Sequence, residues 1–161
     1  MPKIVCSIIL ILFLQACNNR SGSPDARQIS TVSDSVRVMM ESIAASVSQQ
    51  GPVAWLHYFE DTTNFFMASE GRLVFPNNDS ARNFINNTLV KTISKIELQW
   101  HDTRIEPLTA NFAQIAASFH EDITDATGKK MPADGYFTAL AHQTSAGWKL
   151  MNAHWSVIAK Q

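Results

Sequence analysis

The sequence predicts an α+β fold in which helices pack on one face of a curved antiparallel sheet. In the first half of the chain, apolar residues recur every three or four positions, which is typical of amphipathic helices. The second half contains four long apolar or alternating segments separated by short turns, which is typical of strands. Helices followed by long strands indicate α+β rather than alternating α/β.

Three helices are expected before residue 90. The first covers about residues 30–49, and its apolar stripe consists of Ile29, Val32, Val36, Met39, Met40, Ile43 and Val47. Gly51 suits the left-handed cap of this helix, and Pro52 suits the first turn of a second, short helix. Asn78 or Asp79 is expected to cap the third helix, whose apolar positions are Ala81, Phe84, Ile85 and Leu89.

Strands are expected in the remaining segments. Residues 64–68 and 72–75 flank Ser69-Glu70-Gly71, which is a hairpin signal. Longer strands follow over residues 93–100, 110–123, 135–143 and 147–156. Because side chains alternate along a strand, one face of the last strand should carry Trp148, Leu150, Asn152, His154 and Ser156. The other face should carry Met151, Trp155 and Val157.

The N-terminus has the pattern of an exported protein. Lys3 precedes an apolar run over residues 4–14 that is shorter than the roughly 20 residues needed to span a bilayer. The following Leu14-Gln15-Ala16-Cys17 resembles the lipobox of bacterial lipoproteins, and plain secretion is the alternative. This resemblance implies a signal peptide (1–16), lipidation of Cys17, a tether (17–28) and one domain (29–161). Asn18 is not the aspartate that retains enterobacterial lipoproteins at the inner membrane, so the outer membrane, facing the periplasm, is expected.

Composition argues against several function classes. Lys and Arg number 13 against 14 Asp and Glu, and no basic stripe appears, so nucleic acid is not an expected partner. Cys6 lies in the predicted signal peptide, which leaves the mature domain without a disulfide or thiolate site. No histidine cluster has the spacing of metal ligands, and neither a metal nor another cofactor is expected.

The order of elements resembles the nuclear transport factor 2-like superfamily, in particular its SnoaL-like group. Local matches that carry the resemblance lie at residues 58–63, 69–72, 124–129, 147–150 and 154–156. The resemblance implies a cone, in which a curled sheet and three N-terminal helices enclose a pocket. It implies little about chemistry, because such folds host isomerases, cyclases, dehydratases and non-catalytic binders.

The polar candidates for a site lie on two strands. By the resemblance, His154 and Ser156 would line the pocket floor with Asn152 nearby, and the alternative is that His154 only holds the sheet together through hydrogen bonds. His120 and Asp122 share a strand face, where the carboxylate could orient the imidazole as a general base. A solvated surface pair near the strand end is the alternative reading of these two residues.

Aromatic residues are plentiful where a pocket is expected. They could hold a flat apolar ligand or simply form the core, and they are Trp55, Tyr58, Phe59, Phe65, Trp100, Tyr136 and Trp148. Tyr58 and Tyr136 are the best hydrogen-bond donors among them.

Three functions remain open. The favoured one is binding of a small hydrophobic or amphipathic ligand without catalysis, because the strand 64–67 lacks the catalytic aspartate that steroid isomerases of this fold place there. The alternatives are a pocket enzyme that uses His154 or the His120/Asp122 pair, and a structural module. A homodimer is also expected, through an outer sheet face that carries Met151, Trp155 and Val157.

Overall fold

The computed structural model describes residues 25–158 of the chain. The predicted signal peptide, Cys17 and most of the predicted tether therefore lie outside the described residues. No helix within residues 25–158 combines the length and apolar character needed to cross a membrane.

Helix α1 (Ala26–Gln50) confirms the first predicted helix. It begins at Ala26 rather than near residue 30 because Asp25 caps it: the backbone N–H of Gln28 donates to the Asp25 carboxylate at 2.8 Å. Gly51 ends the helix with a φ of 75°, and its N–H donates to the carbonyl of Val47 at 2.9 Å, as the cap prediction requires. The buried face of α1 consists of Val32, Val36, Met39, Met40, Ile43 and Val47.

Two further helical regions follow. A 3-10 turn, η1 (Pro52–Ala54), leads into the short α2 (Trp55–Tyr58). The third region begins with α3 (Asn78–Phe84) and continues through a π-helical turn, η2 (Ile85–Leu89), into α4 (Val90–Thr92). Its cap is Asn77 rather than the predicted Asn78 or Asp79, because the Asn77 side chain accepts the N–H of Ser80 at 2.9 Å.

Six strands form one mixed sheet in the order β2-β1-β6-β5-β4-β3. Their bounds are β1 (Phe66–Ser69), β2 (Arg72–Phe75), β3 (Ile93–Pro107), β4 (Phe112–Asp125), β5 (Lys130–Thr144) and β6 (Gly147–Val157). Every neighbouring pair is antiparallel except β1 and β6, which run parallel. The prediction of a purely antiparallel sheet was wrong in this one pairing.

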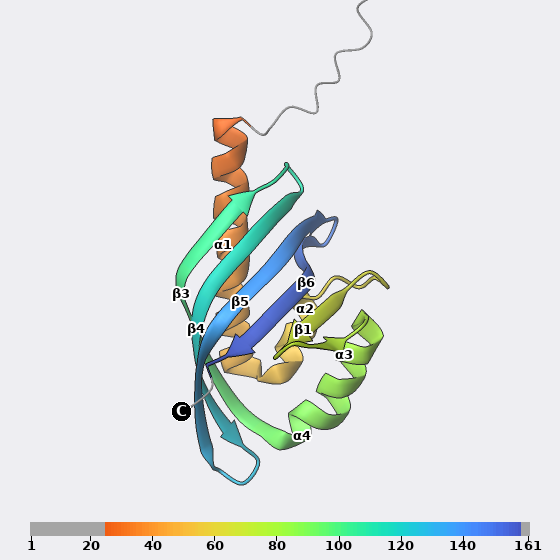
Figure 1. Cartoon of the computed structure of the whole chain (residues 1–161), viewed down its shortest axis with the longest axis vertical. Helices are drawn as coiled ribbons and strands as arrows, with labels where there is room; N and C mark the ends of the chain where they lie inside the picture. Colours follow the sequence, from red (N-terminus) through yellow and green to blue (C-terminus); the bar gives the residue numbers. More distant parts are fainter. Residues whose placement is uncertain (1–24, 159–161) are drawn as a thin grey trace, which may run out of the picture.

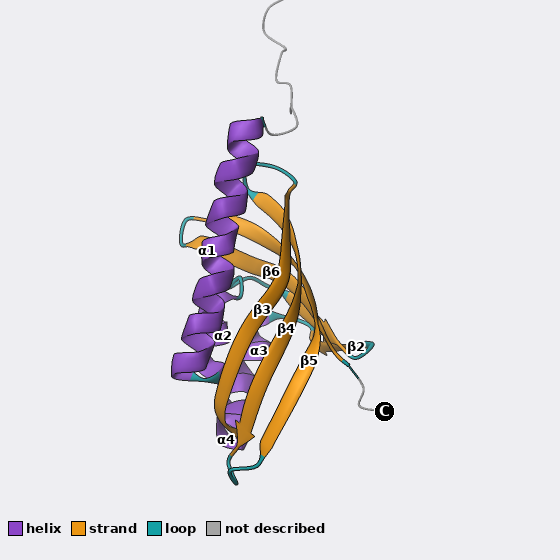
Figure 2. Ribbon diagram, turned by 90° about the vertical axis from the view of Figure 1, so that its left-hand side faces the viewer, coloured by secondary structure: helices purple, strands orange, loops and turns teal. Residues whose placement is uncertain are grey.

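The sheet curves around the helices. Figure 2 shows α1, α2 and α4 on the same side of the sheet, and Figure 1 shows α3 and α4 below the β1–β2 hairpin. Two register shifts interrupt the pairing of β3 with β4, one of them at Asp102, whose φ is 49°. Such bulges bend a strand and increase its twist. We call the side toward the helices the concave face and the other side the convex face.

A bulge in β6 decides which side chains face the helices. Asn152 pairs with Leu140, but the next paired residue is Leu150 with Ala141, so Met151 is an extra residue. Leu150 is fully buried against the helices, and three positions later Ala153 is buried on the same face. An extra residue moves every following side chain to the opposite face. The prediction that His154 and Ser156 share the face of Leu150 was therefore wrong.

Candidate functional site

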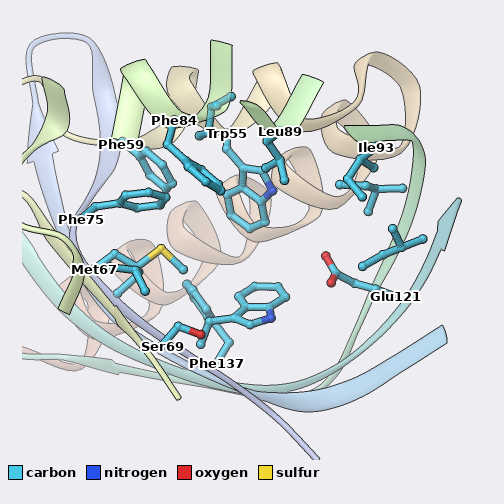
Figure 3. A pocket seen from close by; sticks show the side chains of 16 residues that line it. Trp55, Phe59, Met67, Ser69, Phe75, Phe84, Leu89, Ile93, Glu121 and Phe137 are labelled. Atoms are coloured by element: carbon cyan, nitrogen blue, oxygen red, sulfur yellow. The ribbon is translucent and has the colours of Figure 1, made fainter. Parts of the chain in front are cut away.

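A cavity of about 510 Å³ lies between the concave face, the β1–β2 hairpin and the second and third helical regions (Figure 3). Its lining is almost wholly apolar and consists of Trp55, Phe59, Met67, Ser69, Val74, Phe75, Phe84, Ile85, Leu89, Ile93, Ile96, Glu121, Ile123, Phe137, Ala153 and Trp155. Val74 and Phe84 are the lining residues with large exposed hydrophobic side chains, so they mark the mouth. Ligand pockets of this size and composition suit drug-sized molecules.

Trp155 connects the cavity to the aromatic core. Its ring centroid lies 4.0 Å from that of Phe119, 5.5 Å from Phe137 and 5.7 Å from Trp55. Such contacts fix the ring on both sides and hold it as a rigid wall of the cavity. Trp155 is thus a pocket residue, and its predicted place in an outer contact surface was wrong because the β6 bulge turns it inward.

Among the residues that the structure describes, Glu121 is the only ionisable side chain that lines the cavity. On β4 the inward positions alternate as Ala117, Phe119, Glu121 and Ile123, so strand register alone places the carboxylate among apolar groups. Glu121 is 6% exposed, and no side-chain hydrogen bond among the described residues involves its carboxylate, which lines the open cavity. The fully enclosed side-chain oxygen without a partner in residues 25–158 is instead Oε2 of Glu60. Burial raises the pKa of Glu121 to about 7, and the nearby His120 offsets part of this effect.

Glu121 was not identified from the sequence. The residues singled out were His120 and Asp122, which lie on the opposite, polar face of β4. The available signal was the alternation itself, since a carboxylate interrupts an otherwise apolar series of inward positions.

Of the aromatic residues predicted to bind a ligand, Trp55 and Phe59 line the cavity. Tyr58 does not, because its hydroxyl is held against α1, where it donates to the carbonyl of Ser42 at 2.9 Å and lies 2.8 Å from the hydroxyl of Ser46. Trp100 also belongs to the core, and its Nε1 donates to the carbonyl of Met40 at 2.9 Å. Phe65 is buried in the core, and the partly buried Trp148 packs against this core.

The remaining predicted pocket residues lie on the convex face. Tyr136 pairs with Ser156 across β5 and β6, and Thr138 pairs with His154, all on the side away from the helices. His154 and Tyr136 are exposed to solvent. Asn152 lines a separate, shallow cavity of about 180 Å³ on this face. None of these residues reaches the larger cavity, so the prediction that they line it was wrong.

His120 and Asp122 share the convex face, as their spacing predicts, with 3.6 Å between His120 Nε2 and a carboxylate oxygen of Asp122. Asp134 on β5 is the closer partner, at 2.7 Å from Nδ1. The main cause that raises the pKa of His120 is its hydrogen bond to the Asp134 carboxylate, which accepts from the imidazole. This cluster lies on the opposite side of the sheet from the cavity, so it does not join Glu121 in one site. Within residues 25–158, no three His, Cys, Asp or Glu side chains are grouped to hold a metal ion.

A second carboxylate–imidazole pair lies near the C-terminal end of β5. Glu60 Oε1 is 3.0 Å from Nδ1 of His142, and the His142 ring stacks on Phe112 at 4.4 Å. Glu60 is buried, and its backbone N–H donates to the carbonyl of Leu150 at 2.9 Å. This pair links the segment after α2 to β5 and β6, and it does not line the larger cavity.

Solved structures of other proteins have the same architecture and identify the fold of this chain. A nuclear transport factor 2 superfamily protein from Salmonella enterica superposes with a TM-score of 0.69 at 20% identity, over 82% of this chain and 94% of that chain. The chain has the nuclear transport factor 2-like fold. A ketosteroid isomerase-like protein from Erwinia carotovora atroseptica shares this fold with a TM-score of 0.62 at 14% identity, over 79% of this chain and 96% of that chain.

Proteins with this fold differ in their named activities. A hexachlorocyclohexane dehydrochlorinase, LinA type 3, from Novosphingobium barchaimii superposes with a TM-score of 0.62 at 10% identity, over 82% of this chain and 93% of that chain. A scan of protein-family models and a search of curated proteins find no match to the chain. The nuclear transport factor 2-like fold is therefore established by shape, and the chemistry has to be argued from the cavity itself.

Proposed function

We propose that this domain binds one small, predominantly apolar molecule in the concave cavity without converting it, and that Glu121 orients the bound molecule. The observation that carries the proposal is an apolar cavity of about 510 Å³ with one buried carboxylate in its wall. Apolar walls supply affinity, whereas a single polar group fixes orientation. The neighbours with this fold include proteins named as enzymes and proteins without a named activity, so the fold is compatible with binding alone.

Filling the cavity tests this proposal. The chain is purified from cells and titrated with N-phenyl-1-naphthylamine, an uncharged dye whose fluorescence rises in apolar sites. The Ala153→Leu variant adds a larger side chain inside the cavity and should abolish the signal. The matched control is Ala116→Leu, which makes the same change in the convex face opposite Thr138. Equal dye binding by both variants and the unmodified chain would contradict a cavity site.

Acid–base catalysis by Glu121 is the second candidate function. A carboxyl group whose pKa is raised to about 7 is suited to accept and return a proton at neutral pH. Mass spectrometry of the molecule that co-purifies with the chain separates the two functions. Recovery of an unchanged molecule after incubation supports binding, and a product that forms with the unmodified chain but not with Glu121→Gln supports catalysis.

We also propose that Cys17 carries lipid and holds the domain at the periplasmic side of the outer membrane. The support is the signal-like segment before Cys17 and the polar stretch after it. Replacement of Cys17 by serine should move the protein from the membrane fraction to the soluble fraction and remove incorporation of a labelled fatty acid. Unchanged fractionation of this variant would contradict the lipid anchor.

A further inference from the structure

The Glu121 carboxylate is oriented toward whatever occupies the cavity. Figure 3 shows it directed into the cavity, across from Met67 and Phe75. Its neighbours on the adjacent strands are Leu98 and Ala133, neither of which can donate a side-chain hydrogen bond. Buried polar groups in folded proteins normally have a partner. The side chains of residues 25–158 make no hydrogen bond to Glu121, whose carboxylate is open to the cavity, so a ligand that fills the cavity can supply the partner.

The charge of the cavity narrows the choice of ligand. Within residues 25–158, no lysine, arginine or histidine side chain lines it, and the imidazole of the adjacent His120 is on the convex face, bound to Asp134. An anionic ligand would therefore meet a carboxylate without any compensating cation. A neutral ligand could make a hydrogen bond but would leave the buried charge unpaired. A cationic ligand supplies both the donor and the charge that the cavity lacks.

The rest of the wall suits the same class of ligand. Indole rings of Trp55 and Trp155 and the phenyl ring of Phe137 line the space that a ligand would fill. Aromatic faces attract both apolar carbon skeletons and cations. The cavity therefore combines an apolar, aromatic wall with one anionic group.

We propose that the ligand of this pocket is an apolar amine, whose protonated nitrogen pairs with Glu121 and whose carbon skeleton fills the aromatic part of the cavity. This inference rests on the proposed binding function and specifies the chemistry of the ligand. It does not depend on whether the ligand comes from the membrane or from solution.

The state of Glu121 then makes binding depend on pH. With a pKa raised to about 7 in the empty cavity, the carboxyl is mostly protonated at acidic pH and mostly ionised at mildly alkaline pH. Pairing with a cation requires the ionised form. Affinity for an amine should therefore rise roughly 30-fold between about pH 5.5 and about pH 8, in proportion to the ionised fraction.

Three biphenyl probes that differ in one group test the inference. The full chain is titrated by calorimetry with 4-phenylbenzylamine, 4-phenylbenzyl alcohol and 4-phenylbenzoic acid at about pH 8. The amine should bind at least about 10-fold more tightly than the alcohol, because charge-assisted hydrogen bonds are the stronger ones. The acid should bind more weakly than the alcohol.

Two variants assign the preference to the cavity carboxylate. Glu121→Gln keeps the shape of the side chain and removes its charge, so it should lower amine affinity at least about 10-fold and abolish its pH dependence, with alcohol affinity within about 3-fold of the original. Asp122→Asn removes the neighbouring carboxylate on the convex face and should leave all three affinities unchanged.

Each outcome has a defined meaning. If amine and alcohol bind equally, or if Glu121→Gln leaves amine affinity unchanged, the amine inference is overturned while the binding function stands. If the biphenyl probes and N-phenyl-1-naphthylamine all fail to bind a folded chain, the binding function fails and the amine inference fails with it.

Discussion

Glu121 destabilises the empty fold at neutral and alkaline pH. Its carboxyl pKa is raised from 4.5 to about 7, so the folded chain holds this proton more tightly than the unfolded chain does. The resulting stability is fully present below about pH 4.5 and is lost as the pH rises through about 7. A shift of this size corresponds to about 3 kcal/mol, at 1.36 kcal/mol per pKa unit. An unfavourable group of this kind at a cavity wall is typical of functional sites.

Replacement of Glu121 by glutamine should accordingly stabilise the ligand-free chain in a pH-dependent way. At about pH 8 the free energy of unfolding should rise by about 1–3 kcal/mol, because the buried charge is removed. At about pH 4 the two proteins should differ little, because the glutamate is then protonated. Denaturant unfolding at both pH values measures the difference, and Asp122→Asn is the control without this pattern. A gain of equal size at both pH values would exclude ionisation of Glu121 as its cause.

Gly135 is required by the close packing of Phe119. A Cβ atom at this position would lie 2.4 Å from the Phe119 ring and 2.1 Å from the carbonyl oxygen of Ser156. Both contacts are far below van der Waals distance, and one of them is to backbone, which cannot turn away. The glycine therefore leaves room for the Phe119 ring, whose centroid lies 4.0 Å from that of Trp155.

The Gly135→Ala variant should lose about 1–3 kcal/mol of stability, the usual cost of overpacking a dense core. The displaced Phe119 ring should also disturb Trp155, which would change the intrinsic fluorescence of the chain. Thr138→Ala, on the convex face of the same strand, is the control and should change the fluorescence little. A variant as stable as the unmodified chain would mean that the strand relaxes around the added methyl group.

Among the elements, β6 was predicted from the sequence, but the faces on which its side chains lie were predicted only in part. Strict alternation correctly places Trp148 and Leu150 on one face, and it fails after Met151. The position of a bulge depends on how β6 pairs with β5 and with the distant β1, so the alternation within β6 alone cannot reveal it. For this reason Trp155 was assigned to the outside, and Asn152, His154 and Ser156 were assigned to the pocket. By contrast, α1 follows a local period of 3.6, and six of the seven apolar positions predicted for it are buried. The exception is Ile29, which is exposed near the start of the helix.

Deletion of Met151 should test the role of the bulge. Without the extra residue, strict alternation from Leu150 places Ala153 and Trp155 inward and His154 outward, as in the structure, so the deletion should keep Trp155 buried. Acrylamide quenching of tryptophan fluorescence should stay close to that of the unmodified chain. Deletion of both Met151 and Asn152 reverses the facing of the following residues, so it should increase the quenching and cost more than about 3 kcal/mol through loss of a buried tryptophan. Equal quenching of the two deletion variants would show that the bulge does not set the facing of β6.

For the whole molecule, the order and type of elements were predictable from the sequence, and the edge pairing was not. The three helical regions and six strands follow from periodicity and turn residues, both of which are local. The parallel pairing of β1 with β6 joins residues more than eighty positions apart, and no local pattern encodes it. The cavity was expected from the resemblance to the superfamily, whereas its lone carboxylate follows only from three-dimensional register.

The homodimer remains a prediction, but Trp155 lines the cavity and cannot be part of its contact surface. The convex face carries no helix in the part of the chain described by the structure (Figure 2), and Tyr136 is 45% exposed there. If two copies pair through this face, Tyr136→Glu should weaken the dimer because it places a charge in the contact. Val38→Glu, on an exposed part of α1, is the control. Sedimentation that shows only monomers of the unmodified chain would refute the dimer.

Strand β6 contributes to two regions of the molecule. Leu150 is part of the buried core, whereas Ala153 and Trp155 form part of the cavity wall. The hydrogen bonds of β6 to β1 and β5 therefore open only if both regions loosen together. A guest molecule that holds the wall closed should slow deuterium uptake at the amides of residues 152–156 more than at the far end of β3. The backbone of this strand would then report occupancy directly, even for a ligand that is neither coloured nor fluorescent.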